Sequence, residues 1–412
     1  MAEELGLDYY RFSISWTRLL PTGFSNYISE DGKNYYNNLI NGLLSKGIAP
    51  VVTIYHFDLP QSLQDLGGWA NPLVADWFAD YARVVFSLFA DRVPIWLTMN
   101  EPIGICDNGY NKNAAPYIDD MEIGVFLCTK HTLLAHAKAY RIYDNEFKPK
   151  YHGKVSISTV FMWFEPASSE DEEITDMAFA YWEGRFCHAI FSKEGGWPPL
   201  LQATFDDLSQ QQGYSRSRLP PFSKEEIELV KGTYDFYGLN HYTTRLVRQA
   251  KPGDKVGPWP FYGSEDLKFH LEKDPAWENT DIDWFTVYPQ GLYRQLHWLK
   301  KTYDINEVMI TENGYPSFSG RLDDDRRSSY INEHLASVLL ALTDGINVTG
   351  YVVWTMMDNF EWFGGYGAKF GLYAVDFSSP LRTRSPRDSA RYLRAITDTR
   401  TLLPIHKSSS SS

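Results

Sequence analysis

Short apolar segments alternate with amphipathic segments along most of the chain, and this alternation constrains the fold more than any other feature. Seven apolar segments have the length and β-branched content of strands: residues 8–15, 50–57, 94–100, 154–161, 234–240, 307–313 and 350–357. Helical periodicity lies between them, for example over residues 35–47, 75–92 and 327–345. Strands that are apolar on both faces and alternate with helices form a parallel sheet.

The residues at the ends of these segments distinguish two kinds of parallel sheet. Nucleotide-binding doubly wound sheets carry glycine-rich phosphate loops, and no segment here opens into G-x-G-x-x-G or a P-loop. Functional groups at the carboxyl ends of successive strands are instead typical of a barrel. The sequence therefore predicts an α/β fold, a TIM (β/α)8 barrel with seven strands countable. The polar and aromatic strand-end residues are Arg11, His56, Asn100, Glu101, Asn240, Tyr242, Glu312 and Trp354.

The chain is longer than the ~250 residues of a typical barrel. We expect one barrel domain over residues 1–405, with the surplus in loops at 101–126, 195–230 and 245–285, and a disordered Ser-rich tail over 406–412. The first residues, MAEELGLDYY, predict a helix already under way at Met1. We therefore expect the first strand of the barrel to be missing.

Composition and charge exclude several classes of partner. The formal net charge of −13 disfavours nucleic acids and anionic membranes. No run of 18 apolar residues predicts a membrane span. The three cysteines match no zinc pattern and allow one disulfide or none, so we expect neither a metal nor a cofactor. The aromatic content of 16% suits a cleft in which rings stack on sugars, and core packing explains it equally well.

Two strand ends carry a glutamate beside an asparagine, in TMNEP (98–102) and TENG (311–314). Glycoside hydrolysis needs two carboxyl groups on either side of the scissile bond, one as acid and one as nucleophile or base. A glutamate at a strand end lies at the mouth of a barrel. Each glutamate alone could be a surface residue, but the pair predicts a glycosidase.

Seven sequence motifs resemble those of a known enzyme family. YRFSISW (10–16), YHFDLPQ (55–61), TMNEP, GLNHYT (238–243), ITENG (310–314), VVWTMMDNFEW (352–362) and KFGLYAVDF (369–377) follow one another along the chain. Their order resembles that of glycoside hydrolase family 1, the retaining β-glucosidases, and of its animal members above all. The resemblance extends from about residue 3 to about residue 395.

The resemblance implies roles for individual residues. Glu101 would be the general acid/base and Glu312 the nucleophile, with their carboxyls about 5–5.5 Å apart. Arg11 would keep Glu312 ionised, Tyr242 would orient it, and Asn100 would bind the sugar 2-hydroxyl. The remaining positions carried over from the family are His56, Glu361 and Trp362 for sugar hydroxyls, Trp354 as a stacking platform, Phe370 as a wall of the sugar pocket, and Asn240 as a support for this network.

The resemblance also has departures. Family members begin with a strand that ends in a sugar-binding glutamine, for which this chain has no counterpart. Phe57 occupies a position where the family commonly has Trp. The implied substrate is a small glycoside or oligosaccharide, and a secreted or gut-lumenal location fits the resemblance.

Three alternative functions remain to be weighed. A sugar-binding relative without turnover would explain a missing strand, although both glutamates are kept. A thioglucosidase needs little acid assistance, so Glu101 favours O-glycosides, but insect thioglucosidases retain this residue as well. Phospho-β-glucosidases are excluded, because the Glu361 carboxylate would repel a sugar phosphate.

Overall fold

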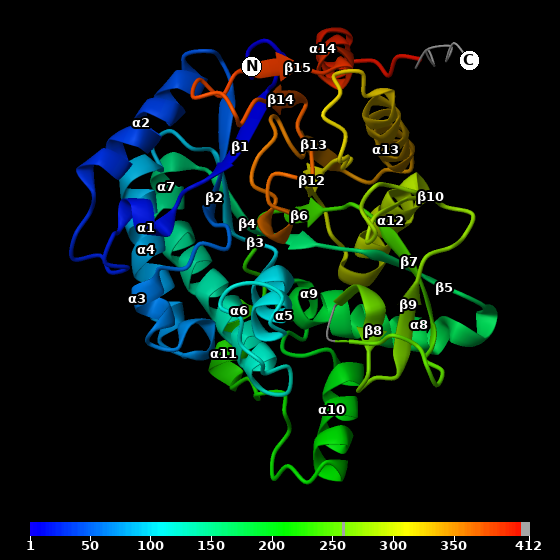
Figure 1. The fold of residues 1–412 in the computed structure, drawn as a ribbon. Helices are drawn as coiled ribbons and strands as arrows, with labels where there is room; N and C mark the ends of the chain where they lie inside the picture. The colour runs from blue at the N-terminus through cyan, green and yellow to red at the C-terminus, as the bar shows by residue number, and fades with distance from the viewer. Residues whose placement is uncertain (258–259, 405–412) are drawn as a thin grey trace.

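Seven parallel strands form the centre of the molecule (Figure 1). The computed structural model describes residues 1–257 and 260–404. The prediction of a parallel sheet with seven strands is confirmed, although the last strand begins and ends earlier than expected. In hydrogen-bonded order the strands are β1 (Tyr9–Ser13), β2 (Ala49–Tyr55), β3 (Ile95–Asn100), β4 (Lys154–Val160), β6 (Tyr237–Asn240), β12 (Val308–Asn313) and β13 (Val348–Val353).

The sheet curves into a nearly closed barrel. Its terminal strands, β1 and β13, come into contact. Within the described residues no hydrogen-bonded ladder joins β1 to β13, so the barrel has a seam between them. The predicted helix at Met1 is wrong: residues 2–6 form a turn in which Leu5 N donates to Met1 O at 2.9 Å. Gly6, with φ of +63°, ends this turn in a conformation that suits glycine.

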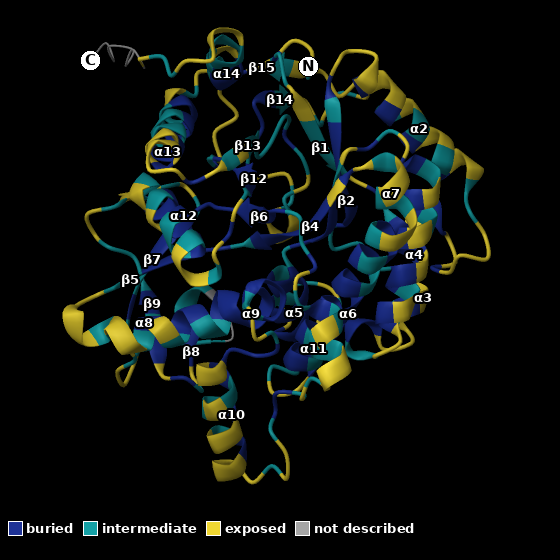
Figure 2. Ribbon diagram, turned by 180° about the vertical axis from the view of Figure 1, so that it is seen from behind, coloured by how far each residue is buried: buried dark blue, intermediate teal, exposed yellow. Residues whose placement is uncertain are grey.

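Helices surround the sheet and turn their buried faces toward it (Figure 2). The predicted helices correspond to α2 (Glu30–Leu44), α4 (Val74–Phe89) and α13 (Asp325–Thr343). α2 begins five residues earlier than its apolar pattern predicts, because the Ser29 side chain caps it by accepting from Gly32 N at 3.1 Å. The other long helices are α6 (Gly124–Ile142) and α12 (Pro289–Tyr303).

The three segments expected to be loops contain ordered elements. Residues 101–126 include α5 (Pro102–Tyr110), and residues 195–230 include α10 (Pro199–Gln211) and α11 (Lys224–Val230). Between 245 and 285, β7 (Thr244–Gln249), β8 (Gly263–Ser264) and β9 (Phe269–Glu272) join β5 (Trp163–Pro166) in a second sheet. These segments were predicted as long loops, and the sequence did not reveal their helices and strands because short elements lack the repeated apolar spacing of long ones.

The remaining α-helices and β-strands of the described structure are shorter. They are α1 (Trp16–Leu19), α3 (Gln61–Gln64), α7 (Lys148–Tyr151), α8 (Glu172–Phe179), α9 (Arg185–Phe191), α14 (Asp388–Thr399), β10 (Glu278–Asn279), β11 (Thr286–Val287), β14 (Tyr373–Val375) and β15 (Arg384–Pro386). In the part of the chain that the structure describes, no helix has the length and apolar character needed to cross a bilayer. The predicted disordered tail, residues 406–412, lies outside the described residues.

A disulfide joins two helices near the barrel mouth. Cys106 on α5 is bonded to Cys128 on α6, and Cys187 is a buried free thiol. Of the two alternatives that three cysteines allowed, the structure has the one with a single bridge. The bridge fixes α5, the helix that follows Glu101, to the long helix α6 beside it.

Candidate active site

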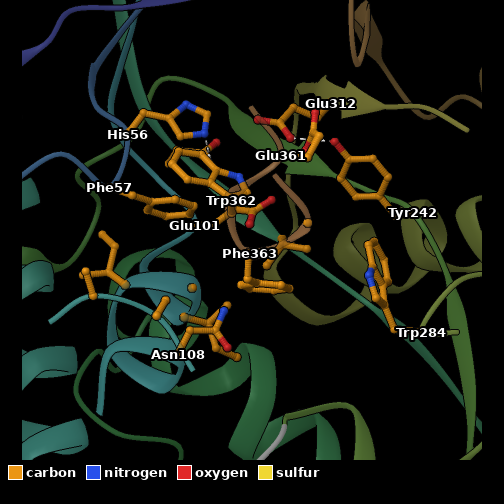
Figure 3. A pocket seen from close by; sticks show the side chains of 18 of the residues that line it. His56, Phe57, Glu101, Asn108, Tyr242, Trp284, Glu312, Glu361, Trp362 and Phe363 are labelled. Carbon is orange, nitrogen blue, oxygen red and sulfur yellow. Dashed lines mark hydrogen bonds between the residues drawn. The ribbon is translucent and has the colours of Figure 1, made fainter. Parts of the chain in front are cut away.

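A cavity of about 670 Å³ lies at the carboxyl ends of the barrel strands. Of the eleven predicted site residues, all but Arg11 and Asn240 line it, and these two donate hydrogen bonds to its carboxyl groups. Figure 3 shows two ends of this cavity, which we call the inner and the outer half. The inner half is formed by His56, Asn100, Glu101, Tyr242, Glu312, Trp354, Glu361, Trp362 and Phe370, and the outer half by Asn108, Trp182, Phe261, Trp284, Phe318 and Phe363.

Glu312, at the end of β12, is held by two donors. Arg11 Nη1 donates to Glu312 Oε1 at 2.5 Å, and the Tyr242 hydroxyl donates to Oε2 at 2.7 Å. Arg11 and Glu312 are both almost fully buried. A hydrogen bond between a guanidinium and a carboxylate is among the stronger ones in proteins. Both oxygens of Glu312 are therefore fixed in position.

Arg11 reaches Glu312 because β1 presents its side chain to the barrel interior. The guanidinium also donates from Nε to Thr53 Oγ1 at 3.1 Å and from Nη2 to Asn100 Oδ1 at 2.6 Å. These bonds tie groups from β1, β2, β3 and β12 into one network. A planar fork of donors fixed on several strands has little freedom to turn away from the carboxylate.

Glu101 occupies an unusual backbone position directly after β3. Its φ is +43°, a region that non-glycine residues rarely adopt, and its N–H donates to Ser158 O at 2.8 Å. Pro102 begins α5 immediately afterwards. Such a conformation costs on the order of 1–3 kcal/mol and is concentrated at functional sites. The turn places the Glu101 side chain on the cavity wall.

The Glu101 carboxyl lies in surroundings that favour its neutral form. Burial, followed by the negative charge of Glu312, raises the pKa of Glu101 to about 8. Glu101 Oε1 accepts a hydrogen bond from a neutral donor, Asn240 Nδ2, at 2.7 Å. Asn240 is oriented in turn by the hydroxyls of Ser158 and Thr311, which donate to its Oδ1. At neutral pH, Glu101 is therefore mainly protonated.

Asn100 and His56 form the adjoining wall. Asn100 Nδ2 donates to His56 Nε2 at 3.2 Å, while Asn100 Oδ1 accepts from Arg11 and from Asn240 Nδ2 at 3.1 Å. Burial, and then the positive charge of Arg11, lower the pKa of His56 to about 3. His56 is thus a neutral imidazole with Nε2 as the acceptor, so that Nδ1 carries the proton.

Aromatic rings and a third carboxyl complete the inner half. The His56 ring stacks with Trp354, at 5.8 Å between centroids, and with Trp362 at 5.5 Å. Trp354 Nε1 donates to Glu361 Oε1 at 3.0 Å. Burial, and then the charge of Glu312, raise the pKa of Glu361 to about 7. The buried Phe370 ring lies 6.1 Å from the Tyr242 ring, on the same wall.

None of the outer-half residues was among the site residues predicted from the sequence. Trp284 and Phe261 come from the segment 245–285, where no pattern marked them, and Phe363 lies beside the predicted Trp362. The rings of Phe318 and Phe363 are 56% and 62% exposed, so they lie at the rim of the cavity. Apart from its aromatic richness, the sequence carries no signal that would have found them.

A buried carboxyl outside the cavity was also missed. Glu183 Oε1 accepts from the Tyr237 hydroxyl at 2.5 Å and from Cys187 Sγ at 2.6 Å. Burial raises the pKa of Glu183 to about 7, and its charge contributes to the raised pKa of Glu101. Glu183 lies within a helical stretch of the sequence, where a carboxylate normally faces solvent.

Among residues 1–257 and 260–404, no group of three or more His, Cys, Asp or Glu side chains is placed to hold a metal ion. The two carboxyls of the inner half differ in their surroundings. Glu312 lies against the Arg11 guanidinium, whereas Glu101 is buried beside Glu312 and its pKa is raised. Two carboxyls in such different environments can serve as a nucleophile and an acid.

Comparison with known proteins identifies the family of the chain. The family model described as "Glycosyl hydrolase family 1" matches residues 1–402. Myrosinase 1 of Brevicoryne brassicae is 43% identical over 403 residues, which cover 96% of this chain and 85% of that protein. The cytosolic beta-glucosidase of Homo sapiens is 39% identical over 395 residues, covering 94% of this chain and 83% of that protein.

Solved structures give the same result. "Aphid myrosinase" superposes with a TM-score of 0.91 at 43% identity, covering 96% of this chain and 85% of its own. A beta-glucosidase from Thermotoga maritima in complex with castanospermine superposes with a TM-score of 0.85 at 34% identity, covering 98% of this chain and 85% of its own. Both similarities extend over nearly all of this chain.

Proposed function

The chain belongs to glycosyl hydrolase family 1, and we propose that it hydrolyses β-O-glucosides and related β-glycosides by double displacement, with Glu312 as nucleophile and Glu101 as acid/base. The observation that carries this proposal is the opposite electrostatic setting of the two carboxyls in one cavity. Glu312 has Arg11 at 2.5 Å, whereas Glu101 has an amide donor and a negative neighbour. The first can attack as a carboxylate, and the second can give up a proton.

In the first step, a Glu312 oxygen attacks the anomeric carbon, and the bond to the glycosidic oxygen breaks. Glu101 donates its proton to that oxygen, so that the aglycone leaves as a neutral alcohol. The products are a glycosyl ester on Glu312 and an ionised Glu101. Tyr242 and Arg11 fix the attacking carboxylate, so little reorganisation precedes the attack.

The second step uses the change of charge produced by the first. Once Glu312 is esterified, it no longer carries the negative charge that helps to raise the Glu101 pKa. Glu101 is then ionised and takes a proton from water as the water oxygen attacks the anomeric carbon. The ester bond breaks, Glu312 leaves as a carboxylate, and the sugar is released with its original β configuration.

The other residues of the inner half are proposed to hold the sugar. His56, Asn100, Glu361 and Trp362 offer hydrogen-bonding groups or edges, Trp354 a flat face, and Phe370 an apolar wall. Asn100 would bind the 2-hydroxyl, a contact that strengthens as the transition state develops charge.

Product stereochemistry tests this proposal. The protein is mixed with 4-nitrophenyl β-glucoside, and the anomeric proton of the released glucose is followed by NMR before mutarotation. We expect β-glucose to form first. Release of α-glucose first, or no release of glucose, would overturn the double displacement assigned to Glu312.

The myrosinase relatives favour one second candidate, hydrolysis of S-glucosides. A thiolate leaves without a proton, so this reaction would not need the raised pKa of Glu101. Comparing kcat/KM for the O- and S-glucosides of one aglycone separates the candidates. We expect the O-glucoside to be the better substrate, and a better S-glucoside would favour the alternative.

A further inference from the structure

We propose that the outer half of the cavity selects neutral, flat and apolar aglycones and rejects anionic ones. This inference rests on the proposed function, because the aglycone must lie beyond the bond that Glu101 and Glu312 cleave. In Figure 3 the outer-half residues Asn108, Trp284 and Phe363 lie lower in the view than His56, Glu312 and Glu361. A sugar in the inner half would direct its leaving group toward these rings.

The first argument is the shape and chemistry of the walls. The Trp284 ring stacks on Phe261 with 5.2 Å between centroids and an interplanar angle of 27°. It also meets the Tyr242 ring edge-on at 6.3 Å, so the aromatic wall is continuous with the group that holds Glu312. Phe363 and Phe318 supply further rings at the rim. Flat apolar molecules gain most from such surfaces, because both area burial and ring stacking contribute.

The second argument is charge. Of the described residues that line the cavity, none is Lys or Arg, whereas Glu101, Glu312 and Glu361 all line it. His56 is neutral because its pKa is lowered to about 3. An anionic aglycone would lose its hydration, meet no cation, and lie near the Glu312 carboxylate. Burial of an unpaired charge is strongly unfavourable, and a like charge adds to this cost.

Arg245 is a cation close to the aromatic wall, and it does not offer a site for an anion. The Arg245 guanidinium lies 5.9 Å from the centroid of the Phe261 ring. Arg245 itself is only 3% exposed. Nη1 donates to Thr244 O at 2.8 Å, and Nη2 donates to Trp284 O. The carbonyl and hydroxyl oxygens around it satisfy these donors behind the wall.

The third argument is the small number of polar side chains in the outer half. Of its six residues, only Asn108 carries a side-chain amide, while Trp182 and Trp284 each carry a single indole N–H and the other three are phenylalanines. These few polar groups suit a flat apolar ring that bears at most a small polar substituent.

The test uses three substrates that share the glucosyl group. The 3-carbamoylphenyl and 3-carboxyphenyl β-glucosides have almost the same shape, and their phenols are leaving groups of similar acidity, but only the second is anionic at neutral pH. β-Glucosyl fluoride has no aglycone and reports on the inner half alone. We expect kcat/KM to be at least about tenfold higher for the neutral aryl glucoside than for the anionic one, since a buried charge must be desolvated.

Two variants locate the selectivity. Trp284→Ala should lower the ratio of kcat/KM for the neutral aryl glucoside to that for glucosyl fluoride by about tenfold, since the ring stack is lost. Phe363→Ala should lower this ratio in the same direction, and its exposed ring makes loss of folding a minor concern. Tyr35→Ala, an exposed tyrosine on α2 outside the cavity, is the matched control and should leave the ratio within about twofold.

The outcomes distinguish failure of the aglycone inference from failure of the proposed function. The inference is overturned if kcat/KM is equal for the two aryl glucosides or higher for the anionic one. The proposed function stays intact in that case as long as glucosyl fluoride is still turned over. An unchanged ratio in both Trp284→Ala and Phe363→Ala overturns the assignment to these rings. No turnover of glucosyl fluoride overturns the proposed function, and the inference falls with it.

Discussion

The two halves of the cavity are built in different ways. In the inner half, the strands β1, β3, β6 and β12 supply Arg11, Asn100, Asn240 and Glu312, which are joined by hydrogen bonds across the sheet. In the outer half, the rings come from connecting segments and meet mainly through stacking. The barrel therefore fixes the positions of the two carboxyls, while the aromatic rings lie on segments of the kind that vary more readily than a barrel strand.

One helix joins the two halves. α5 begins next to Glu101 and carries Asn108 two turns later. Its middle is tied down by the Cys106–Cys128 disulfide and by Asp107, whose carboxylate pairs with Arg185 Nη2 at 2.8 Å in the buried interior. A shift of α5 would therefore affect both the acid and the aglycone. We expect α5 to couple the two halves of the cavity.

The largest expected effect comes from removing the nucleophile in the inner half. Glu312→Ala should lower kcat on aryl β-glucosides by more than about 10⁴-fold, because no other described group can form the ester. Azide should restore turnover and give the α-glucosyl azide, since it attacks from the vacated side. Product analysis by NMR checks this, and activity near that of the unaltered protein would contradict the assignment.

Removal of the acid should give an effect that depends on the leaving group. Glu101→Gln keeps the shape of the side chain and an oxygen for the Asn240 donor, but it has no proton to give. Hydrolysis of phenyl β-glucoside should fall by about 10²–10⁴-fold. The glycosylation step with 2,4-dinitrophenyl β-glucoside, measured in the pre-steady state, should fall less than about tenfold. Equal losses for both substrates would argue against Glu101 as the acid.

The pH dependence of kcat/KM should show a smaller effect, which comes from Glu101 in the inner half. The first step needs protonated Glu101, and the pKa of this group is raised to about 8. The value of kcat/KM for phenyl β-glucoside should therefore stay high at neutral pH and fall about tenfold per pH unit above this pKa. Glycosylation by the dinitrophenyl substrate should lack this alkaline limb. An alkaline limb that persists in Glu101→Gln would show that another group causes it.

The smallest effect on catalysis is expected from the link between the halves. Replacing both Cys106 and Cys128 by Ser removes a bridge between residues 22 positions apart, which should lower the free energy of unfolding by about 2–4 kcal/mol. The kcat/KM for glucosyl fluoride should change less than that for an aryl glucoside, because Glu101 is also held by Asn240. Urea unfolding and paired kinetics measure both. A larger loss with the fluoride would mean that α5 does not couple chiefly to the outer half.

The inner half could be predicted from the sequence because its residues follow long apolar strands. Glu101 and Glu312 each stand where such a strand ends, and parallel strands of one barrel place their carboxyl ends at the same mouth. The motif order then predicted the partners His56, Glu361 and Trp362, although His56 lies far along the sequence from the other two. Their distances and hydrogen bonds required the structure.

The outer half could not be predicted because no periodic pattern marks it. Trp284 and Phe261 lie among short strands and turns, where propensity carries little information. α5 was missed because it is nearly all apolar and only nine residues long, so it has no polar face to show its period. The Cys106–Cys128 pairing depends on the packing of α5 against α6, which local sequence does not encode.

The central claim is that Glu312 forms a covalent bond to the sugar, and trapping that bond tests it most directly. 2-Deoxy-2-fluoro-β-glucosyl fluoride forms the glycosyl ester faster than water can break it, because its fluorine disfavours the charged transition states while its fluoride leaves without a proton. We predict that the intact protein gains the mass of one fluorodeoxyglucosyl group and that peptide mapping places this group on Glu312. An adduct on another residue, or turnover of β-glucosides without any adduct, would contradict the account.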